Sequence, residues 1–367
     1  MHNHYHIGNR HSSSPMMRRT EDMQEKKTTR WQAIRQFCRR RRDALSLAAG
    51  LCTTVAVFSW LFSHISWSQV FNLIRKVDMF WVGIFLIFSV SQQLVRTVRY
   101  RLVLRTAGER PGFFRMLLVV LVRGFCVDLL PARTGELVYL YLLKARLGIG
   151  LGAATASFAL PFLFDIVALG PLVILAVLTI TGGGLSVRAL VVVGALLAAA
   201  SMLAVALMPV ILRIGFAFTA HGALGMPRLR RFLADTHRQV IRARRARIYG
   251  TLFGLSLLVR VLKYSGIYAL LFALLKPEGY TLAQLHAPSA FLGFCAAEMA
   301  ASLPFSGVAG FGAYEGTWSL VFQLLGFPQE MASASGVSHH LLTQVYGYAL
   351  GLAALLAIQI IHKRKHA

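Results

Sequence analysis

Nine charged residues fall within apolar segments of this sequence, and they raise the first question about its chemistry. The acidic ones are Asp128, Glu136, Asp165, Glu298 and Glu315, and the basic ones are Arg123, Arg133, Arg260 and Lys263. A charged side chain near the centre of a bilayer costs about 2.5–3.5 kcal/mol on insertion scales. We therefore expect these residues to pair with one another, to face a polar cavity, or both.

The stretch "PARTGE", which begins at Pro131, interrupts one of the most apolar parts of the chain. Proline disfavours helix at the residue before it, so the preceding helix is expected to end near Leu130. Glu136 then lies in the first turn of the next helix, where the helix dipole favours an anion. Arg133 has two interpretations: it pairs with Glu136 or Asp128 at a capped helix start, or it binds a lipid phosphate in a cavity at mid-membrane depth.

A second polar interruption, "FSGVAGFGAYE", ends at Glu315 and also precedes a short apolar helix. Gly310 and Gly312 permit a backbone turn that could present N–H groups to an anion. Close packing of small residues between helices would equally account for these glycines. The sequence leaves both interpretations open.

Polar or small residues recur at helical spacing on three of the predicted spans. The last span carries Gly336, His340, Gln344, Gly347 and Gly351 on one face, an earlier span carries Ser157, Pro161 and Asp165, and another carries Arg260 and Lys263. Ionisable residues within spans usually face the interior of a helical bundle. We expect the three faces to converge there, with Arg260 or Lys263 satisfied by Asp165, Glu298 or Glu315.

The apolar segments that carry these residues define an all-α polytopic membrane protein. The 367 residues are 56% hydrophobic and only 14% charged, with a mean hydropathy of +0.59, whereas soluble domains are about 25% charged. Runs of about 20 apolar residues are long enough to cross the hydrocarbon core as helices. Six full spans are predicted, at 44–64, 79–95, 153–181, 189–212, 248–275 and 333–361.

Two further pairs of shorter apolar segments are predicted to form hairpins, either re-entrant or fully spanning. They are 114–130 with 137–147, and 289–303 with 314–325. A polar residue follows each hairpin glutamate at the same interval, Asp165 after Glu136 and Gln344 after Glu315. Units of opposite topology with such matching positions are typical of transporters built as inverted repeats. The alternative is a set of plain spans that carry helix-breaking residues by chance.

The net charge of +25 is distributed as expected for a membrane protein. With both termini in the cytoplasm, most of the 39 lysines and arginines fall in cytoplasmic segments, and the outer loops keep only Arg75, Lys76, Arg188 and Lys276. The basic charge therefore indicates topology and affinity for anionic lipid. No motif supports binding of nucleic acid.

The remaining segments are polar. Residues 1–43 are predicted to be a basic, mostly disordered cytoplasmic tail, and 362–367 a second basic tail. The segment 213–247 is predicted to be a basic cytoplasmic loop with an amphipathic helix, which lies on the inner leaflet or serves only as a positive anchor. The cysteines, Cys38, Cys52, Cys126 and Cys295, have no CxxC spacing, so we expect no disulfide, no zinc site and no cofactor.

These motifs resemble the lysylphosphatidylglycerol synthase transmembrane-region family, also called the flippase-like domain family. The resemblance runs over most of 45–361 and rests on "RTVRYRLVLR" after the second span, "PARTGE", Asp165 and "AGFGAYE" at 309–315. It implies translocation of a polar-headed lipid, such as a phospholipid, aminoacylated phosphatidylglycerol, a glycolipid or a hopanoid. Three features depart from the family pattern: the soluble synthase domain is missing, Pro161 and Phe162 replace a Glu-Arg pair, and Ala309 replaces a glycine.

The leading hypothesis is a lipid flippase of the bacterial inner membrane that is not an enzyme. We expect its substrate to contact Arg133, Glu136, Asp165, Arg260, Lys263, Gly310, Gly312, Glu315 and Gln344. One alternative is an accessory or scaffold protein that works with enzymes of lipid biosynthesis. The other is an intramembrane enzyme acting on lipid or peptide, with Ser306 as nucleophile and His339 or His340 as base.

Overall fold

The computed structural model of the chain forms two compact units, Met1–Ala56 and Val57–Ala367. It describes residue 59, residues 66–130, 135–179, 227–302 and 311–366, and most positions from 192 to 214, all within the second unit. The predicted tail at 1–43 lies outside the described residues, as does nearly all of the predicted span at 44–64. The predicted tail at 362–367 is largely a continuation of the last helix, which ends at His366.

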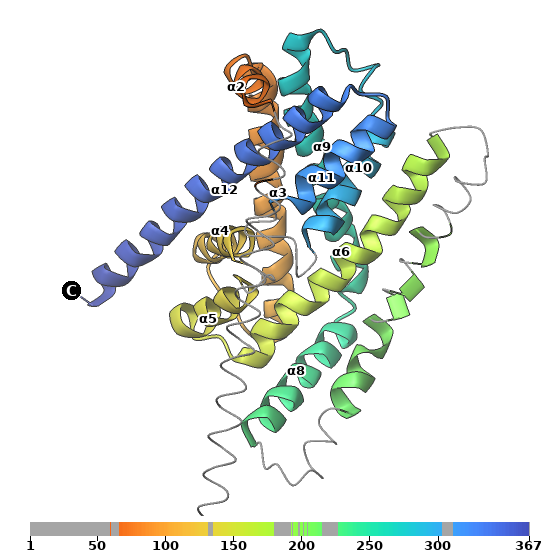
Figure 1. Cartoon of the computed structure of the whole chain (residues 1–367). Helices are drawn as coiled ribbons and strands as arrows, with labels where there is room; N and C mark the ends of the chain where they lie inside the picture. Colours follow the sequence, from red (N-terminus) through yellow and green to blue (C-terminus); the bar gives the residue numbers. More distant parts are fainter. Residues whose placement is uncertain are drawn as a thin grey trace, which may run out of the picture. The chain divides into compact units, whose positions relative to one another are not determined.

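Every regular element among the described residues is helical. Figure 1 shows the order of these elements along the chain. They are α2 (Trp67–Arg75), α3 (Met79–Thr106), α4 (Phe113–Leu129), α5 (Gly135–Leu147), α6 (Leu151–Thr179), α8 (Pro227–Arg245), α9 (Tyr249–Leu275), the 3-10 helix η2 (Lys276–Glu278), α10 (Ala287–Ala301), α11 (Ala313–Leu324) and α12 (Gln329–His366).

Four of the described helices are long and apolar enough to cross a membrane, namely α3, α6, α9 with η2, and α12 as far as Ile361. They coincide with four of the six predicted spans. The predicted span at 189–212 is described only in part, and the shorter apolar helix Val205–Ile214 covers its end. Two of the predicted full spans are therefore not confirmed.

Helix α3 is apolar on its outer face and polar on its inner face. Large apolar side chains at Phe80, Ile87, Leu94 and Val98 are exposed, while Ser89, Gln92 and Arg99 are buried. A soluble helix shows the reverse pattern, with its apolar stripe inward. The arrangement suits a helix whose outer face contacts hydrocarbon.

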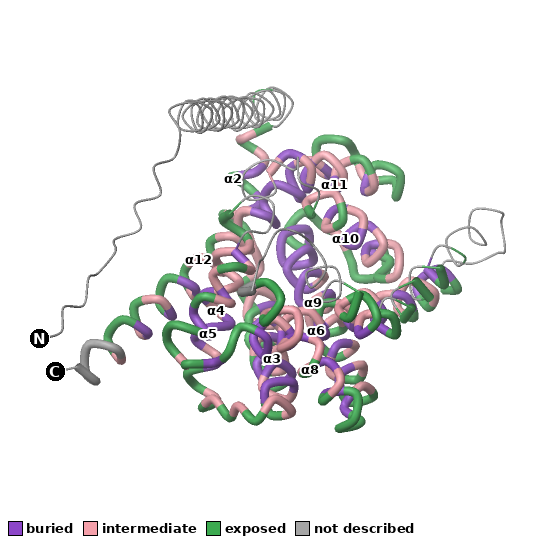
Figure 2. Tube along the Cα trace, turned by 90° about the horizontal axis from the view of Figure 1, so that it is seen from below, coloured by how far each residue is buried: buried purple, intermediate pink, exposed green. Residues whose placement is uncertain are grey.

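Helix α9 is the central helix of this bundle. More than half of its most apolar stretch, 56%, is buried, against 11% for α3 and for α12, and it carries much of the purple in Figure 2. It runs antiparallel to α3, since the Asp78 N–H donates to the Ala273 carbonyl (3.0 Å) at one end and Arg99 reaches Ser256 (2.7 Å) further along. This pairing sets the polar face of α3 against the polar face of α9.

The two predicted helix pairs are present as packed pairs of short helices, α4 with α5 and α10 with α11. Helix α4 ends at Leu129, and Leu130 is extended, as expected for a residue before proline. Glu136 and Glu315 each lie in the first turn of the second helix of their pair. Entry of these pairs into the membrane and the inverted repeat stay predictions.

Helix α12 packs closely against α4 and α11 through glycines. A Cβ atom at Gly351 would lie 2.2 Å from the Phe125 Cβ, and one at Gly336 would lie 2.7 Å from the Trp318 ring. A side chain at either position would push the helices apart, because both distances are far below van der Waals contact. The predicted small-residue face of α12 is therefore a packing face.

Helix α8 lies within the basic segment at 213–247, and its buried side contacts other helices. Thr236, Val240 and Ala243 are buried at 1% exposure or less, and α8 packs against α6. A Cβ atom at Gly152 in α6 would lie 2.6 Å from the Asp235 Cβ. The buried side of α8 thus belongs to the protein core.

Candidate functional site

Asp165 on α6 forms an ion pair with Arg99 on α3 that the sequence analysis did not anticipate. Both carboxylate oxygens accept from the guanidinium, with Nη2 3.1 Å from Oδ2, and Nη1 also donates to the Ser256 hydroxyl on α9 (2.7 Å). The Arg99 side chain is 1% exposed and that of Asp165 is 16% exposed. The predicted span at 79–95 was therefore too short, because α3 continues to Thr106 and carries Arg99 into the protein interior.

Glu136 is bound by Arg123 on the preceding helix. The Arg123 Nε and Nη2 donate to the two carboxylate oxygens at 2.6 and 2.5 Å, and the guanidinium lies over the rings of Tyr100 and Phe158 at 5.6 and 5.5 Å from their centroids. Such a two-point contact is among the strongest that a carboxylate makes. Arg133, the partner that the sequence analysis predicted for Glu136, lies outside the described residues.

Lys263 and Arg260 on α9 face carboxylates from two different helices. The Lys263 ammonium pairs with Glu298 on α10, whose other oxygen accepts from the Tyr264 hydroxyl at 3.0 Å. Arg260 interacts electrostatically with Asp165 and Glu298. Its buried Nε has no hydrogen-bond partner among the described residues. Two of the three predicted acidic partners therefore surround this basic face.

Asp128, near the end of α4, is exposed but lies within reach of several cations. Its carboxylate interacts electrostatically with Lys263, Arg96, Arg123 and His340. Several arginines, lysines and carboxylates on α3, α4, α5, α6, α9 and α10 form ion pairs or interact electrostatically with one another. We call this set the charged interior: Arg96, Arg99, Arg123, Asp128, Glu136, Asp165, Arg260, Lys263 and Glu298. Within it, Asp128 is the one carboxylate for which the described residues provide no direct ion pair.

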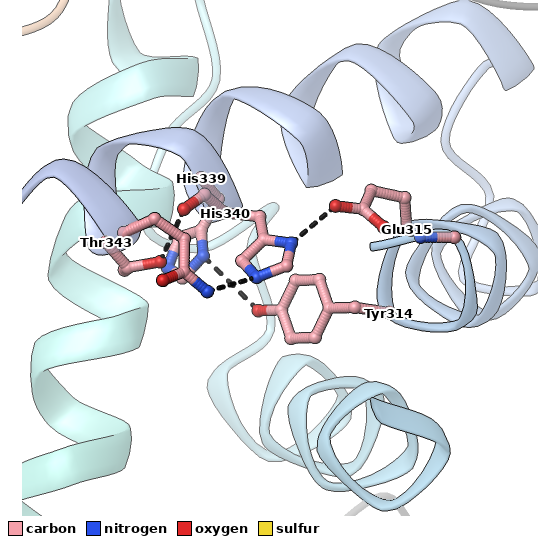
Figure 3. A network of polar contacts seen from close by, with 7 residues as sticks. Tyr314, Glu315, His339, His340 and Thr343 are labelled. Carbon is pink, nitrogen blue, oxygen red and sulfur yellow. Dashed lines mark hydrogen bonds and ion pairs between the residues drawn. The ribbon is translucent and has the colours of Figure 1, made fainter. Parts of the chain in front are cut away.

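Glu315, in the first turn of α11, belongs to a separate buried network (Figure 3). One carboxylate oxygen accepts from the Gly312 N–H at 2.7 Å, and the other lies 2.5 Å from the His340 Nδ1 on α12. The His340 Nε2 lies 2.8 Å from the Gln344 amide nitrogen. A neutral imidazole that carries its proton on Nδ1 satisfies both contacts, because it donates to the carboxylate and accepts from the amide.

This network gives Gly312 a structural role. Its φ of +95° is a conformation that glycine adopts readily and other residues rarely do. Its N–H donates to the chain's own Glu315, so it is not presented to an external anion in this structure. Gly310 lies outside the described residues.

The histidine beside this network has structural contacts as well. His339 lies 3.3 Å from the Tyr314 hydroxyl and stacks on Trp318. Ser306, the nucleophile in the enzyme hypothesis, lies outside the described residues.

The sequence signals that point to the missed residues are visible in retrospect. Ser89, Gln92, Arg96 and Arg99 recur every three or four residues, so they share one face of α3. An arginine on that face is the natural partner for an isolated aspartate in a neighbouring apolar span.

The fold and the inward-facing charges define a polytopic helical membrane protein with a charged interior. The family model described as the lysylphosphatidylglycerol synthase TM region matches residues 44–351, and the chain belongs to this family. It is also similar to a protein named glycosyltransferase AglD from Haloferax volcanii, with 32% identity over 143 residues. That match covers 38% of this chain and 23% of the Haloferax protein, so the chain spans about a quarter of that relative.

Proposed function

We propose that this chain moves a polar-headed lipid between the leaflets of a bacterial inner membrane, with both termini in the cytoplasm. The observation that carries the proposal is the charged interior, in which helices with apolar outer faces turn charged side chains inward. Each such charge costs about 2.5–3.5 kcal/mol to place in the membrane, and a polar-headed substrate is a reason to bear that cost.

A lipid head group with a phosphate and an amine carries both charges that this interior complements. Arg260 and Lys263 provide donors for a phosphate, and the exposed Asp128 provides an acceptor for an ammonium group. The acyl chains would stay in the hydrocarbon along the apolar outer faces of the helices. Membership of the family supports a lipid-related function.

In this proposal the predicted site residues fall into two groups. Arg260 and Lys263 contact the head group, and Glu136 and Asp165 hold the arginines that surround it. Glu315 and Gln344 position His340 and the start of α11. Arg133 and Gly310 remain candidate substrate contacts from the sequence alone.

The name of the Haloferax relative makes transfer of a glycosyl group a second candidate function. Mass spectrometry of lipids incubated with the purified protein and a sugar donor separates the two candidates. A change in head-group mass would favour transfer, and an unchanged lipid that has changed leaflet favours translocation.

The direct test is a leaflet assay in proteoliposomes with fluorescent phosphatidylglycerol and fluorescent lysylphosphatidylglycerol. Lys263→Gln should slow movement about tenfold or more, the equivalent of 1.4 kcal/mol. Lys276→Gln is the matched control, because Lys276 also pairs with a carboxylate, Asp78, but beyond the end of α9. If folded Lys263→Gln protein moves both lipids at the wild-type rate, the proposed path is wrong.

A further inference from the structure

A cleft between α4, α5 and α12 combines two arginines with an apolar floor. It encloses about 60 Å³ and is open to the surface on one side. Its lining residues are Arg115, Leu118, Val119, Arg146, Leu147, Ile358 and Ile361. None of them belongs to the charged interior.

The two arginines come from adjacent helix ends. Arg115 lies in the first turn of α4 and Arg146 in the last turn of α5. Both side chains are exposed, and neither has an ion-pair or hydrogen-bond partner within the part of the chain that the structure describes. With no acidic residue in the lining, the cleft offers two guanidinium groups to an external anion, and a phosphate suits their planar donor geometry.

The apolar side of the cleft has a surface that suits contact with a hydrocarbon chain. Leu118, Val119 and Ile358 form its buried floor with exposures of 6%, 1% and 9%, and Leu147 and Ile361 are half-buried at its edge. A free phosphate would use only the arginines, whereas a phospholipid would use both parts of the cleft.

The position of the cleft agrees with a lipid of the cytoplasmic leaflet. The loop from α3 to α4, the end of α5 and the end of α12 all fall on the side that the distribution of basic residues predicts to be cytoplasmic. The cytoplasmic leaflet holds anionic lipids that attract basic groups near the membrane surface.

We propose that this cleft binds one anionic phospholipid, with its phosphate between Arg115 and Arg146 and one acyl chain against Leu118, Val119 and Ile358. The site is distinct from the charged interior. It does not depend on the proposed function, because binding is measured without movement of lipid between leaflets.

The test is native mass spectrometry of the full chain in a neutral detergent, with dioleoyl-phosphatidylglycerol competing against dioleoyl-phosphatidylcholine. Arg115→Gln combined with Arg146→Gln should weaken retention of phosphatidylglycerol about tenfold. The matched control is Arg105→Gln with Arg110→Gln, which removes the same charge from exposed positions outside the cleft. The control should retain the lipid as the wild type does.

Three results would overturn the proposal. If the control double variant lost phosphatidylglycerol as strongly as the cleft variant, the lost retention would reflect the total surface charge and not the cleft. Equal retention of phosphatidylcholine by the wild type would remove the role of the anionic phosphate. Displacement of phosphatidylglycerol by equimolar inorganic phosphate would show that the acyl chain contributes nothing. If the double variant does not fold, single Arg146→Gln should still weaken retention about threefold, and unchanged retention would count against the site.

Discussion

Replacement of Asp165 by asparagine isolates the energetic role of one pair in the charged interior. The change preserves size and one hydrogen-bond acceptor, but it removes the negative charge and the second acceptor facing Arg99. The Ser256 hydroxyl, 2.7 Å from Nη1, remains as a neutral partner. Arg99 would then be a cation at 1% exposure without a counter-charge.

Two independent estimates agree on the size of this effect. Breaking a buried ion pair by removing one partner costs about 3–5 kcal/mol, and an unpaired arginine in a membrane span costs about 2.5–3.5 kcal/mol. We therefore expect Asp165→Asn to lower the free energy of unfolding by about 3 kcal/mol or more. By contrast, Arg99→Met combined with Asp165→Leu should lie close to wild type, because an apolar pair avoids the desolvation cost of both charges.

The assay is denaturant unfolding in a mild detergent micelle, followed by tryptophan fluorescence and circular dichroism. Ser256→Ala is a control that removes only the neutral partner, and its cost should be about 1 kcal/mol. The reasoning is refuted if Asp165→Asn is as stable as wild type, or if the apolar double variant is as unstable as the single one.

Two further predictions concern packing and pH. Gly351→Leu should lower the free energy of unfolding by about 1–3 kcal/mol, because the new Cβ would lie 2.2 Å from the Cβ of Phe125. The control is Gly83→Ala, whose new Cβ would meet nothing within 4 Å. It should be neutral or stabilising in the same unfolding assay. The hydrogen bond from Lys276 holds the pKa of Asp78 below its ordinary value of 3.8, so this contact stabilises the fold above that pH, and the stability is lost as pH falls through the lowered value. Unfolding measured from pH 6 to pH 3 should therefore show a smaller acid loss in Asp78→Asn than in wild type, and equal losses would contradict the assignment.

The sequence was sufficient for the features that depend on local pattern. Apolar runs located the four described spans, Pro131 located the end of α4, and the glutamates at 136 and 315 located two helix starts. The partners of those glutamates were harder to predict from the sequence. The contact of Glu136 with Arg123, for example, depends on the relative orientation of α4 and α5. Helical spacing alone does not fix that rotation.

Arg99 was missed for a different physical reason. A hydropathy pattern ends a predicted span at the first arginines. The span predicted from the sequence therefore ends at residue 95, although helix α3 continues to Thr106. A charged residue is compatible with a span when a neighbouring helix supplies its counter-charge, as α6 does through Asp165. That information lies 66 residues away along the chain.

The central claim is that the charged interior carries a lipid head group between leaflets. The most direct test is the leaflet assay with the apolar double variant, Arg99→Met with Asp165→Leu, because unfolding data establish separately that this protein is folded. The account predicts that wild type moves fluorescent phosphatidylglycerol or lysylphosphatidylglycerol and that the folded double variant moves neither. Movement of either lipid at the wild-type rate by the double variant would show that the Arg99–Asp165 pair only holds helices together, and would contradict the account.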